Sequence, residues 1–314
     1  MAFRGLFGRG QAPVPEYRFE RAGTELRSQA LASVLGAGAV ASPGFERRAR
    51  DQGIDLSLVW TATVDGRVDA GALLVPHPGR SALLMATSPR DHAHSQVIGR
   101  LVESVLRECE TMPGIRLVQA LSAPSETLRS QAWVHGGMRH LASLDYMERP
   151  MGPDAGPGAA PPEGVRFAAW NPRERDLLQR LLVETYVETL DCPGLAQMRD
   201  PADILDGHLA AGEHDPELWT IAWRGERPVA ALLLSPSSAT ESLEVVYLGI
   251  IPEERARGLG RALVARAIEL GHGRPERVIG LAVDARNTPA VALYARGGFR
   301  TVRRREAFVA GVGH

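Results

Sequence analysis

The chain contains no lysine: all 36 of its basic residues are arginine. A catalytic lysine amine is therefore excluded, and so is a P-loop, whose phosphate-binding motif requires a lysine after its last glycine. The only two cysteines, Cys109 and Cys192, are too few and too far apart for a disulfide framework or a zinc site. The sequence thus predicts a protein of the reducing cytoplasm without a bound metal.

An excess of charge of one sign and a long apolar run are also missing. The 36 basic and 37 acidic residues give a net charge of −1, so nothing indicates a nucleic-acid partner. The longest run of small apolar residues, 30–41, is too short to span a bilayer. We expect a soluble protein that binds neither nucleic acid nor membrane; the sequence says nothing about its oligomeric state.

The chain is organised around a predicted strand, tight loop and helix between residues 244 and 270. Residues 244–251 are rich in β-branched side chains and predict a strand with Glu244 and the other even-numbered residues on one face, and Tyr247 and the odd-numbered ones on the other. Apolar residues then recur at helical spacing, which predicts a helix that begins near Gly258.

The loop between them has the pattern R-x-x-G-x-G, from Arg255 to Gly260. Its glycines leave backbone N–H groups bare at the positive end of a helix dipole, which is an arrangement that binds anions. A dinucleotide fingerprint is excluded because Arg261 and the two residues after it bring no third glycine.

A second motif, D-x-x-N-x-x-A-x-x-L-Y-x-x-x-G-F, runs from Asp284 to Phe299. It predicts the end of a strand and a helix capped by Asn287 or Thr288. A tyrosine in such a helix, here Tyr294, is on its own most simply interpreted as a core residue with its hydroxyl at the rim.

With these two motifs in this order, the sequence resembles the GNAT superfamily of acetyl-CoA-dependent N-acetyltransferases. The resemblance implies that the loop amides hold the coenzyme A pyrophosphate, that the strand pairs with the pantetheine arm, and that Tyr294 donates a proton to the departing thiolate. The cofactor-binding residues it implies are Leu248, Gly249, Ile250, Arg255, Arg257, Gly258, Leu259, Gly260, Arg261, Asn287 and Tyr294.

The resemblance also implies a base and an acceptor site. In tandem members similar in layout to mycothiol synthase, an acidic residue eight positions before the strand-ending proline is the general base, which implies Glu244; Glu241 is the fallback, and the simpler alternative is that Glu244 faces solvent or pairs with an arginine. In this superfamily the first two helices and their joining loop cover the acceptor, which implies substrate contacts from Tyr186, Asp191 and Cys192. The alternative for Cys192 is a small buried apolar residue.

The chain further predicts two related halves. Residues 151–164 are rich in Pro, Gly and Ala, which predicts a linker. Across it, segments that begin at residues 60, 101 and 136 match segments 159 to 162 positions later, which indicates a tandem duplication. We expect an N-terminal tail (1–16), a degenerate GNAT-like domain without catalysis (17–150), the linker, and a catalytic GNAT domain (165–314).

The first half differs where the chemistry is expected. Gln96 and Ile98 replace the two loop glycines, so side chains would crowd a pyrophosphate, and Trp133 stands in the place of Tyr294. In the second half we expect helices over 173–188 and 203–211 and strands over 217–223, 227–235 and 242–251, with a hairpin turn at 224–227. His208 and His214 lack metal-ligand spacing and are expected at the surface or at a helix cap.

The fold class expected is therefore α/β, or α+β, with two tandem folds, each a mixed, mostly antiparallel twisted sheet flanked by helices. The expected activity is direct transfer of acetyl from acetyl-CoA to a primary amine of an unidentified small acceptor, without an acyl-enzyme. Two alternatives stay open: an N-terminal acetyltransferase of the ribosomal-protein type, and a non-catalytic acetyl-CoA-binding regulator or scaffold.

Overall fold

The computed structural model describes residues 16–51, 53–152, 160–238 and 240–313. The elements of the first half are β1 (Arg18–Arg21), α1 (Thr24–Leu35), α2 (Ala37–Val40), α3 (Phe45–Asp51), β2 (Val59–Val64), β3 (Arg67–His77), β4 (Ser81–Ala86), α4 (His92–Cys109), β5 (Leu117–Ser122), α5 (Thr127–His135) and β6 (Arg139–Pro150). Those of the second half are β7 (Val165–Ala169), α6 (Arg175–Tyr186), α7 (Pro201–Leu209), β8 (Trp219–Arg224), β9 (Arg227–Ser237), β10 (Ser242–Ile250), α8 (Leu259–Gly271), β11 (Val278–Asp284), α9 (Thr288–Arg296) and β12 (Arg300–Gly311), with short 3₁₀ turns at Pro172–Glu174, Ala196–Met198, Pro216–Leu218 and Pro252–Glu254.

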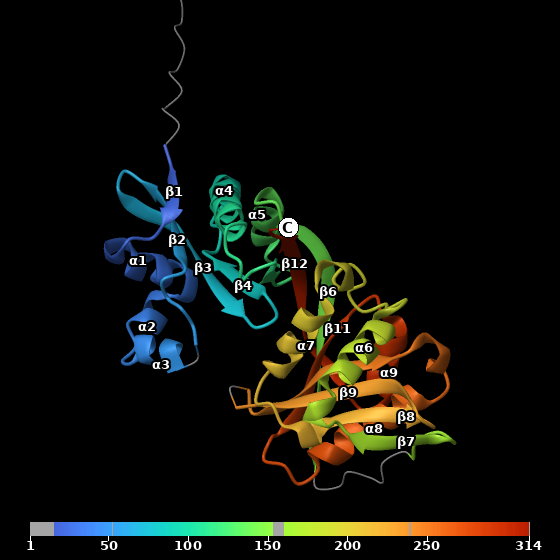
Figure 1. The fold of residues 1–314 in the computed structure, drawn as a ribbon. Helices are drawn as coiled ribbons and strands as arrows, with labels where there is room; N and C mark the ends of the chain where they lie inside the picture. The colour runs from blue at the N-terminus through green and yellow to red at the C-terminus, as the bar shows by residue number, and fades with distance from the viewer. Residues whose placement is uncertain (1–15, 52, 153–159, 239, 314) are drawn as a thin grey trace, which may run out of the picture.

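The strands form one twelve-stranded sheet in the order β1-β2-β3-β4-β5-β12-β6-β11-β10-β9-β8-β7 (Figure 1). This order is symmetric: each strand of the first half has its counterpart of the second half at the mirrored place. The spacing along the chain matches, because α5 and α9 begin 161 residues apart, as do β6 and β12. Two copies of one element order thus build the sheet.

The last strand of each half is exchanged. β12 pairs antiparallel with β5 of the first half, β6 pairs antiparallel with β11 of the second half, and β6 and β12 pair with each other. In Figure 1, β6 and β12 lie side by side where the two halves meet. The predicted mixed, mostly antiparallel sheets flanked by helices are confirmed, but they are joined into one through two strands that have changed sides.

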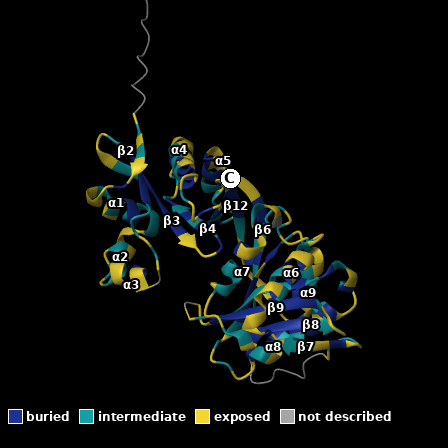
Figure 2. Cartoon of the chain, viewed as in Figure 1, coloured by how far each residue is buried: buried dark blue, intermediate teal, exposed yellow. Residues whose placement is uncertain are grey.

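Helices cover both faces of the sheet in each half. In the second half the core includes Leu181 of α6, Leu233 of β9 and Leu263 of α8, all at most 1% exposed. In the first half, α1 packs on β2 and β3, while α4 packs on the face that holds Trp60. Figure 2 shows the buried residues concentrated along the strands and the exposed ones on the outer sides of the helices. None of the helices in the described part of the chain is long and apolar enough to cross a membrane.

Contacts from the loop and helix after α6 hold the halves together. Arg80, in the β3–β4 turn, donates from Nε to the Asp203 carboxylate of α7 (2.8 Å) and pairs also with Asp200. Arg139 of β6 donates to the carbonyl of Gly194 (3.0 Å). The 187–200 loop therefore lies across the exchanged strands.

The predicted helices and strands of the second half all occur, with ends that differ by up to two residues at most positions. The start of α8 at Leu259 and the hairpin turn between β8 and β9 are as expected. Of the predicted tail, only Glu16 is described, and residues 153–159 of the predicted linker also lie outside the described residues.

Candidate active site

A β-bulge in β10 determines which side chains share a face. The register slips between Val245 and Tyr247, so that Glu244 opposes Ser235, Tyr247 opposes Leu233 and Gly249 opposes Ala231. Directly opposed residues of antiparallel strands lie on one face, so Glu244, Tyr247 and Gly249 share the face toward α6 and α7, which we call the front face. The alternation predicted from the sequence, with Glu244 and Tyr247 on opposite faces, is wrong because the bulge inserts one extra residue between them.

Beyond Glu244, β10 separates from β11. Their parallel pairing covers only Ser242, Leu243 and Glu244. Residues Leu248, Gly249 and Ile250 continue to pair with β9, while on their other side the β11 ladder has ended. Backbone N–H and C=O groups at this edge are available to an extended ligand that enters between the strands.

The loop after β10 presents an uncapped helix start. Gly258, with φ of 85°, is the N-cap of α8, and no side chain of the described residues caps the first turn. The first N–H groups of a helix have no intrahelical partner, so those of Leu259, Gly260 and Arg261 are available to an anion. Arg257 and Arg261 are exposed beside them.

Gly260 has a packing role. A β-carbon at Gly260 would lie 3.0 Å from Leu293 of α9, so a glycine here lets the two helices approach closely.

The side chain of Arg255 is occupied within the protein. Its guanidinium donates to the carbonyls of Ile250 (3.0 Å), Thr185 (3.0 Å), Val187 (2.7 Å) and Glu188 (3.1 Å). A cation at the end of α6 satisfies carbonyls that the helix leaves free and complements its dipole. Arg255 thus ties α6 to the loop, and neither its guanidinium nor its backbone N–H, which donates to the carbonyl of Pro252 (3.2 Å), is free for a cofactor.

Asn287 and Tyr294 lie on α9 as the motif predicts. The Asn287 side chain caps the helix by accepting from the Ala290 N–H (3.3 Å). Tyr294 is 8% exposed, and its ring packs against Phe299. Burial first, and then the charge of Asp191, raise the pKa of Tyr294 well above its usual value, so the hydroxyl keeps its proton at neutral pH.

The 187–200 loop brings Asp191 and Cys192 toward α9. Oδ1 of Asp191 accepts from the Asp284 N–H (2.8 Å), and burial raises the pKa of the Asp191 carboxyl. Burial also raises the pKa of Cys192 to about 12, and its side chain packs against a buried apolar cluster that includes Leu141 and Val309. Cys192 therefore has the environment of an apolar residue and not of a reactive thiol.

Tyr186 belongs to an aromatic cluster under α6 and α7. Its ring lies 5.4 Å from that of Tyr247, and the Tyr247 hydroxyl hydrogen-bonds Oγ1 of Thr185 (2.8 Å). A β-carbon at Gly249 would collide with the Tyr247 hydroxyl, so this tyrosine lies over the strand at its open edge.

His208 completes this cluster and corrects the sequence prediction. Its ring lies 5.1 Å from Tyr247, its Nε2 is buried, and burial lowers the pKa of His208 to about 3. The surface position expected for His208 is wrong, whereas His214 is exposed. The available signal was its spacing: His208 follows Ile204 by four residues and so shares the apolar stripe of α7.

The two candidate bases differ in position. Glu244 is half-buried on the front face, where its carboxylate lies against Gly280 of β11 and accepts from the Ser242 hydroxyl. Glu241 is exposed in the β9–β10 turn and pairs with Arg277 (3.1 Å). Of the two, only Glu244 lies on the face of Tyr247 and Gly249.

The helix start of the first half is closed by its own side chain, and Gln96 and Ile98, which were expected in the loop, lie inside α4 because that helix already begins at His92. Asp91 is the N-cap of α4, and its Oδ1 accepts from the His94 N–H (2.7 Å). Trp133, at the position of Tyr294, is 1% exposed in the core. A carboxylate thus occupies the helix start at which an anion would have to bind.

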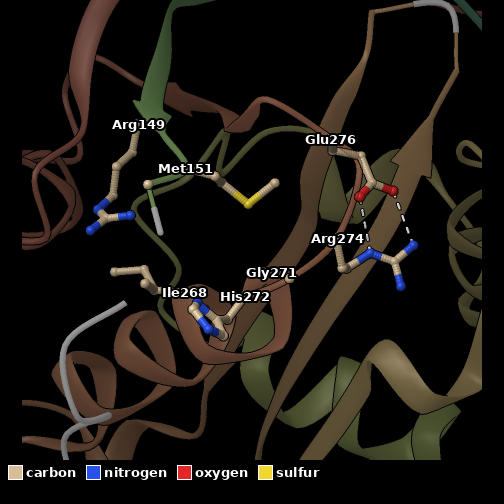
Figure 3. Close-up of a pocket in the computed structure, with 9 residues that line it drawn as sticks. Arg149, Met151, Ile268, Gly271, His272, Arg274 and Glu276 are labelled. Carbon is tan, nitrogen blue, oxygen red and sulfur yellow. Dashed lines mark hydrogen bonds and ion pairs between the residues drawn. The ribbon is translucent and has the colours of Figure 1, made fainter. Parts of the chain in front are cut away.

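A pocket of about 420 Å³ lies elsewhere, between the end of β6 and the end of α8 (Figure 3). Its lining includes Arg149, Met151, His272 and Arg274, and Arg274 forms a double hydrogen bond with Glu276. It lies at the C-terminal end of α8; because a helix of 13 residues is about 20 Å long, it is separate from the loop at the N-terminal end. Among the described residues, no group of His, Cys, Asp or Glu is suited to hold a metal ion.

Comparison with known proteins agrees with this geometry. Residues 178–299, which contain both motifs, match the acetyltransferase (GNAT) family. The chain is 30% identical to a mycothiol acetyltransferase of Streptomyces scabiei over 236 residues, which are 70% of this chain and 67% of that protein. The chain belongs to the GNAT acetyltransferase family.

A further relative and a solved structure are also similar to this chain. A mycothiol acetyltransferase of Streptomyces bingchenggensis is 32% identical over 188 residues, a match that spans 55% of this chain and 60% of that relative's length. Among solved structures, a tandem GNAT protein from the clavulanic acid biosynthesis pathway superposes with a TM-score of 0.54 at 15% identity, covering 95% of this chain and 99% of that one. This likeness supports the doubled GNAT fold.

Proposed function

We propose that the protein is an acetyl-CoA-dependent N-acetyltransferase whose second half carries the catalytic site. The observation that carries the proposal is the conjunction of an uncapped helix start at Gly258 with an open strand edge at Leu248–Ile250. The first can hold a diphosphate and the second an extended arm, and they are joined by a loop of a few residues. The donor's phosphates would bind the amides of residues 257–260, and its arm would pair with β10.

The remaining side chains supply proton transfer. An amine attacks a thioester only when it is neutral, and Glu244, on the front face, is the proposed acceptor of the ammonium proton. The amide groups at the open edge of β10 would polarise the thioester carbonyl. Tyr294, whose hydroxyl stays protonated, is the proposed donor to the departing thiolate. Attack is direct, because Cys192 has no nucleophilic environment.

The first half is proposed to be structural. Asp91 fills its helix start, Trp133 replaces the tyrosine, and its last strand completes the sheet beside β11. For the acceptor we propose a small molecule, supported by the curated relatives, which are named for acetyl transfer involving mycothiol. Tyr186 and Asp191, which lie near the open strand edge, are the proposed contacts to that acceptor.

Thiol release from acetyl-CoA, measured over a panel of primary amines, tests the proposal. We expect amine-dependent release that is lost in Glu244→Gln and Tyr294→Phe, with acetyl-CoA binding retained in both variants by calorimetry. Binding without release for any amine would favour a regulator or scaffold, and acetylation of peptide N-termini alone would favour a protein acetyltransferase. Absence of binding would overturn the proposal altogether.

A further inference from the structure

The front face of the sheet is uncovered beside Glu244. Along β11, Leu281 and Val283 are buried under α8 and α9, while Ala282, which points to the front face, is exposed. β11 is a central strand, so an exposed residue in its middle means that none of the helices and loops in the described part of the chain covers the sheet at that point.

The exchanged strands supply the side chains around this uncovered area. Tyr146 of β6 opposes Ala282, and Arg303 of β12 opposes Tyr146, so all three lie on the front face. Gly280, against which the Glu244 carboxylate lies, is two residues before Ala282. One half therefore contributes the tyrosine and the other the arginine, next to the proposed base.

These groups interact electrostatically. The guanidinium of Arg303 lies over the Tyr146 ring, 5.3 Å from its centroid. Burial raises the pKa of Tyr146, Arg303 and Arg305 lower it, and Glu244 raises it, so the tyrosine lies within range of all three charges.

Arg303 and Arg305 have no acidic partner among the residues that the structure describes. Within the described ranges, neither Arg303 nor Arg305 forms an ion pair, although Arg304 between them pairs with Asp145 on the opposite face (2.7 Å). An arginine that stacks on an aromatic ring with its N–H fork free is suited to bind a carboxylate or phosphate in bidentate fashion.

We propose that the acceptor carries an anionic group, a carboxylate or a phosphate, that binds Arg303 and Arg305 while its amine is held at Glu244. This proposal rests on the proposed acetyltransferase function. β12 is three strand spacings from β10, but the guanidinium of Arg303 lies over Tyr146 of β6, which is two spacings from β10. The amine and the anion of the acceptor are therefore separated by roughly 10 Å.

Matched acceptors that differ only in the anion test this inference. Triglycine places a carboxylate about 10 Å from its amine when extended, and triglycinamide lacks the charge. 6-Aminohexyl phosphate and 6-aminohexanol form the equivalent pair for phosphate. We expect kcat/KM for an anionic member to exceed that of its neutral partner about tenfold, as for one charge-assisted interaction.

Variants of Arg303 test whether this arginine causes the preference for anionic acceptors. Arg303→Ala should raise KM for the anionic acceptor about tenfold and leave kcat, the neutral acceptor and the KM for acetyl-CoA within about twofold. Arg303→Lys should restore part of the loss. Arg67→Ala, which removes an exposed arginine from a strand of the first half, is the control and should change none of these values.

The outcomes separate the two proposals. Equal use of charged and neutral partners, or a preference that survives in Arg303→Ala, overturns the inference and leaves the acetyltransferase function in place. Bound acetyl-CoA without transfer to any of the four amines counts against the proposed function itself.

Discussion

The starts of α4 and α8 are counterparts in the two halves, and they differ in one local feature. α4 begins at an aspartate whose carboxylate accepts from its own first turn, whereas α8 begins at a glycine in a left-handed conformation that caps nothing. Both helices pack on the sheet through buried apolar residues such as Leu101 and Leu263. The core that specifies the fold is therefore retained in both halves, while the groups at the helix start, which are not needed for packing, have diverged.

The largest effect is expected from removing the hydroxyl of Tyr294, the proposed proton donor, which the first half lacks because Trp133 stands in its place. Tyr294→Phe should lower kcat by roughly 10²- to 10³-fold, the usual contribution of one positioned acid, without weakening acetyl-CoA binding. Tyr17→Phe removes a hydroxyl that bonds Asp69 in the first half (2.8 Å) and should leave kcat unchanged. Steady-state kinetics measure kcat, and calorimetry measures acetyl-CoA binding, for both variants. An equal loss of kcat in the two would contradict a catalytic role that is confined to the second half.

The second-largest effect is expected when an aspartate, the capping residue of the first half, is introduced at the helix start of the second half. Gly258→Asp introduces a carboxylate where the diphosphate is proposed to bind, and we expect the Kd for acetyl-CoA to rise at least tenfold, or about 1.4 kcal/mol. Gly258→Asn is the control, because it has the same shape, tolerates a positive φ and carries no charge. Calorimetry on both variants isolates the charge; equally weak binding would show that backbone strain alone is responsible.

Half-buried His208 in the second half and buried His94 in the first should contribute differently to the loss of stability in acid. The pKa of His208 is lowered from 6.5 to about 3 by burial and then by Arg199. The unfolded chain therefore binds a proton that the folded chain excludes, so this stability is present above pH 6.5 and is lost as the pH falls toward 3. The pKa of His94 is also lowered by burial, but Asp69 lies 3.7 Å away and opposes the shift.

Thermal unfolding between pH 7 and pH 5 measures this difference. The fall in Tm should be smaller in His208→Gln than in the parent protein, and His94→Gln should alter the slope less. Parallel pH profiles for all three proteins would contradict the assignment of the acid sensitivity to His208.

The smallest effect is expected at the cap of the first half. Asp91→Ala removes the acceptor of the His94 N–H and should lower the free energy of unfolding by about 1 kcal/mol, while acetyl transfer stays unchanged. Asp91→Asn should retain most of that stability. Urea unfolding with parallel activity assays checks this, and a loss of acetyl-CoA binding in Asp91→Ala would give the first half a role in the cofactor site.

The sequence predicted much of the local structure because local rules determine it. Asn287 followed by Thr288 and Pro289 is a helix start, and the structure shows the Asn287 cap. The helix that begins after Gly258 follows in the same way from apolar spacing and a glycine-rich loop.

Strand partners and the bulge could not be predicted in this way. The alternation of apolar residues in 139–150 and 300–311 determines which face is buried but not which edge each strand joins, so the exchange of β6 and β12 is invisible in the sequence. The extra residue at Val246 leaves no signal either, and it reversed the face of Glu244 relative to Tyr247. The position of Arg303 beside Tyr146 depends on that exchange and was missed for the same reason.

The crossing of β6 and β12 also bears on how such a chain could arise. If a single ancestral repeat paired its last strand with the sheet of a second copy, the resulting homodimer would have the same interleaved sheet. Its assembly would then depend on the protein concentration. Fusion of the two copies makes that association intramolecular and frees each repeat to change separately. The covalent link thus lets the two helix starts diverge, as those of α4 and α8 have, while the shared sheet stays intact.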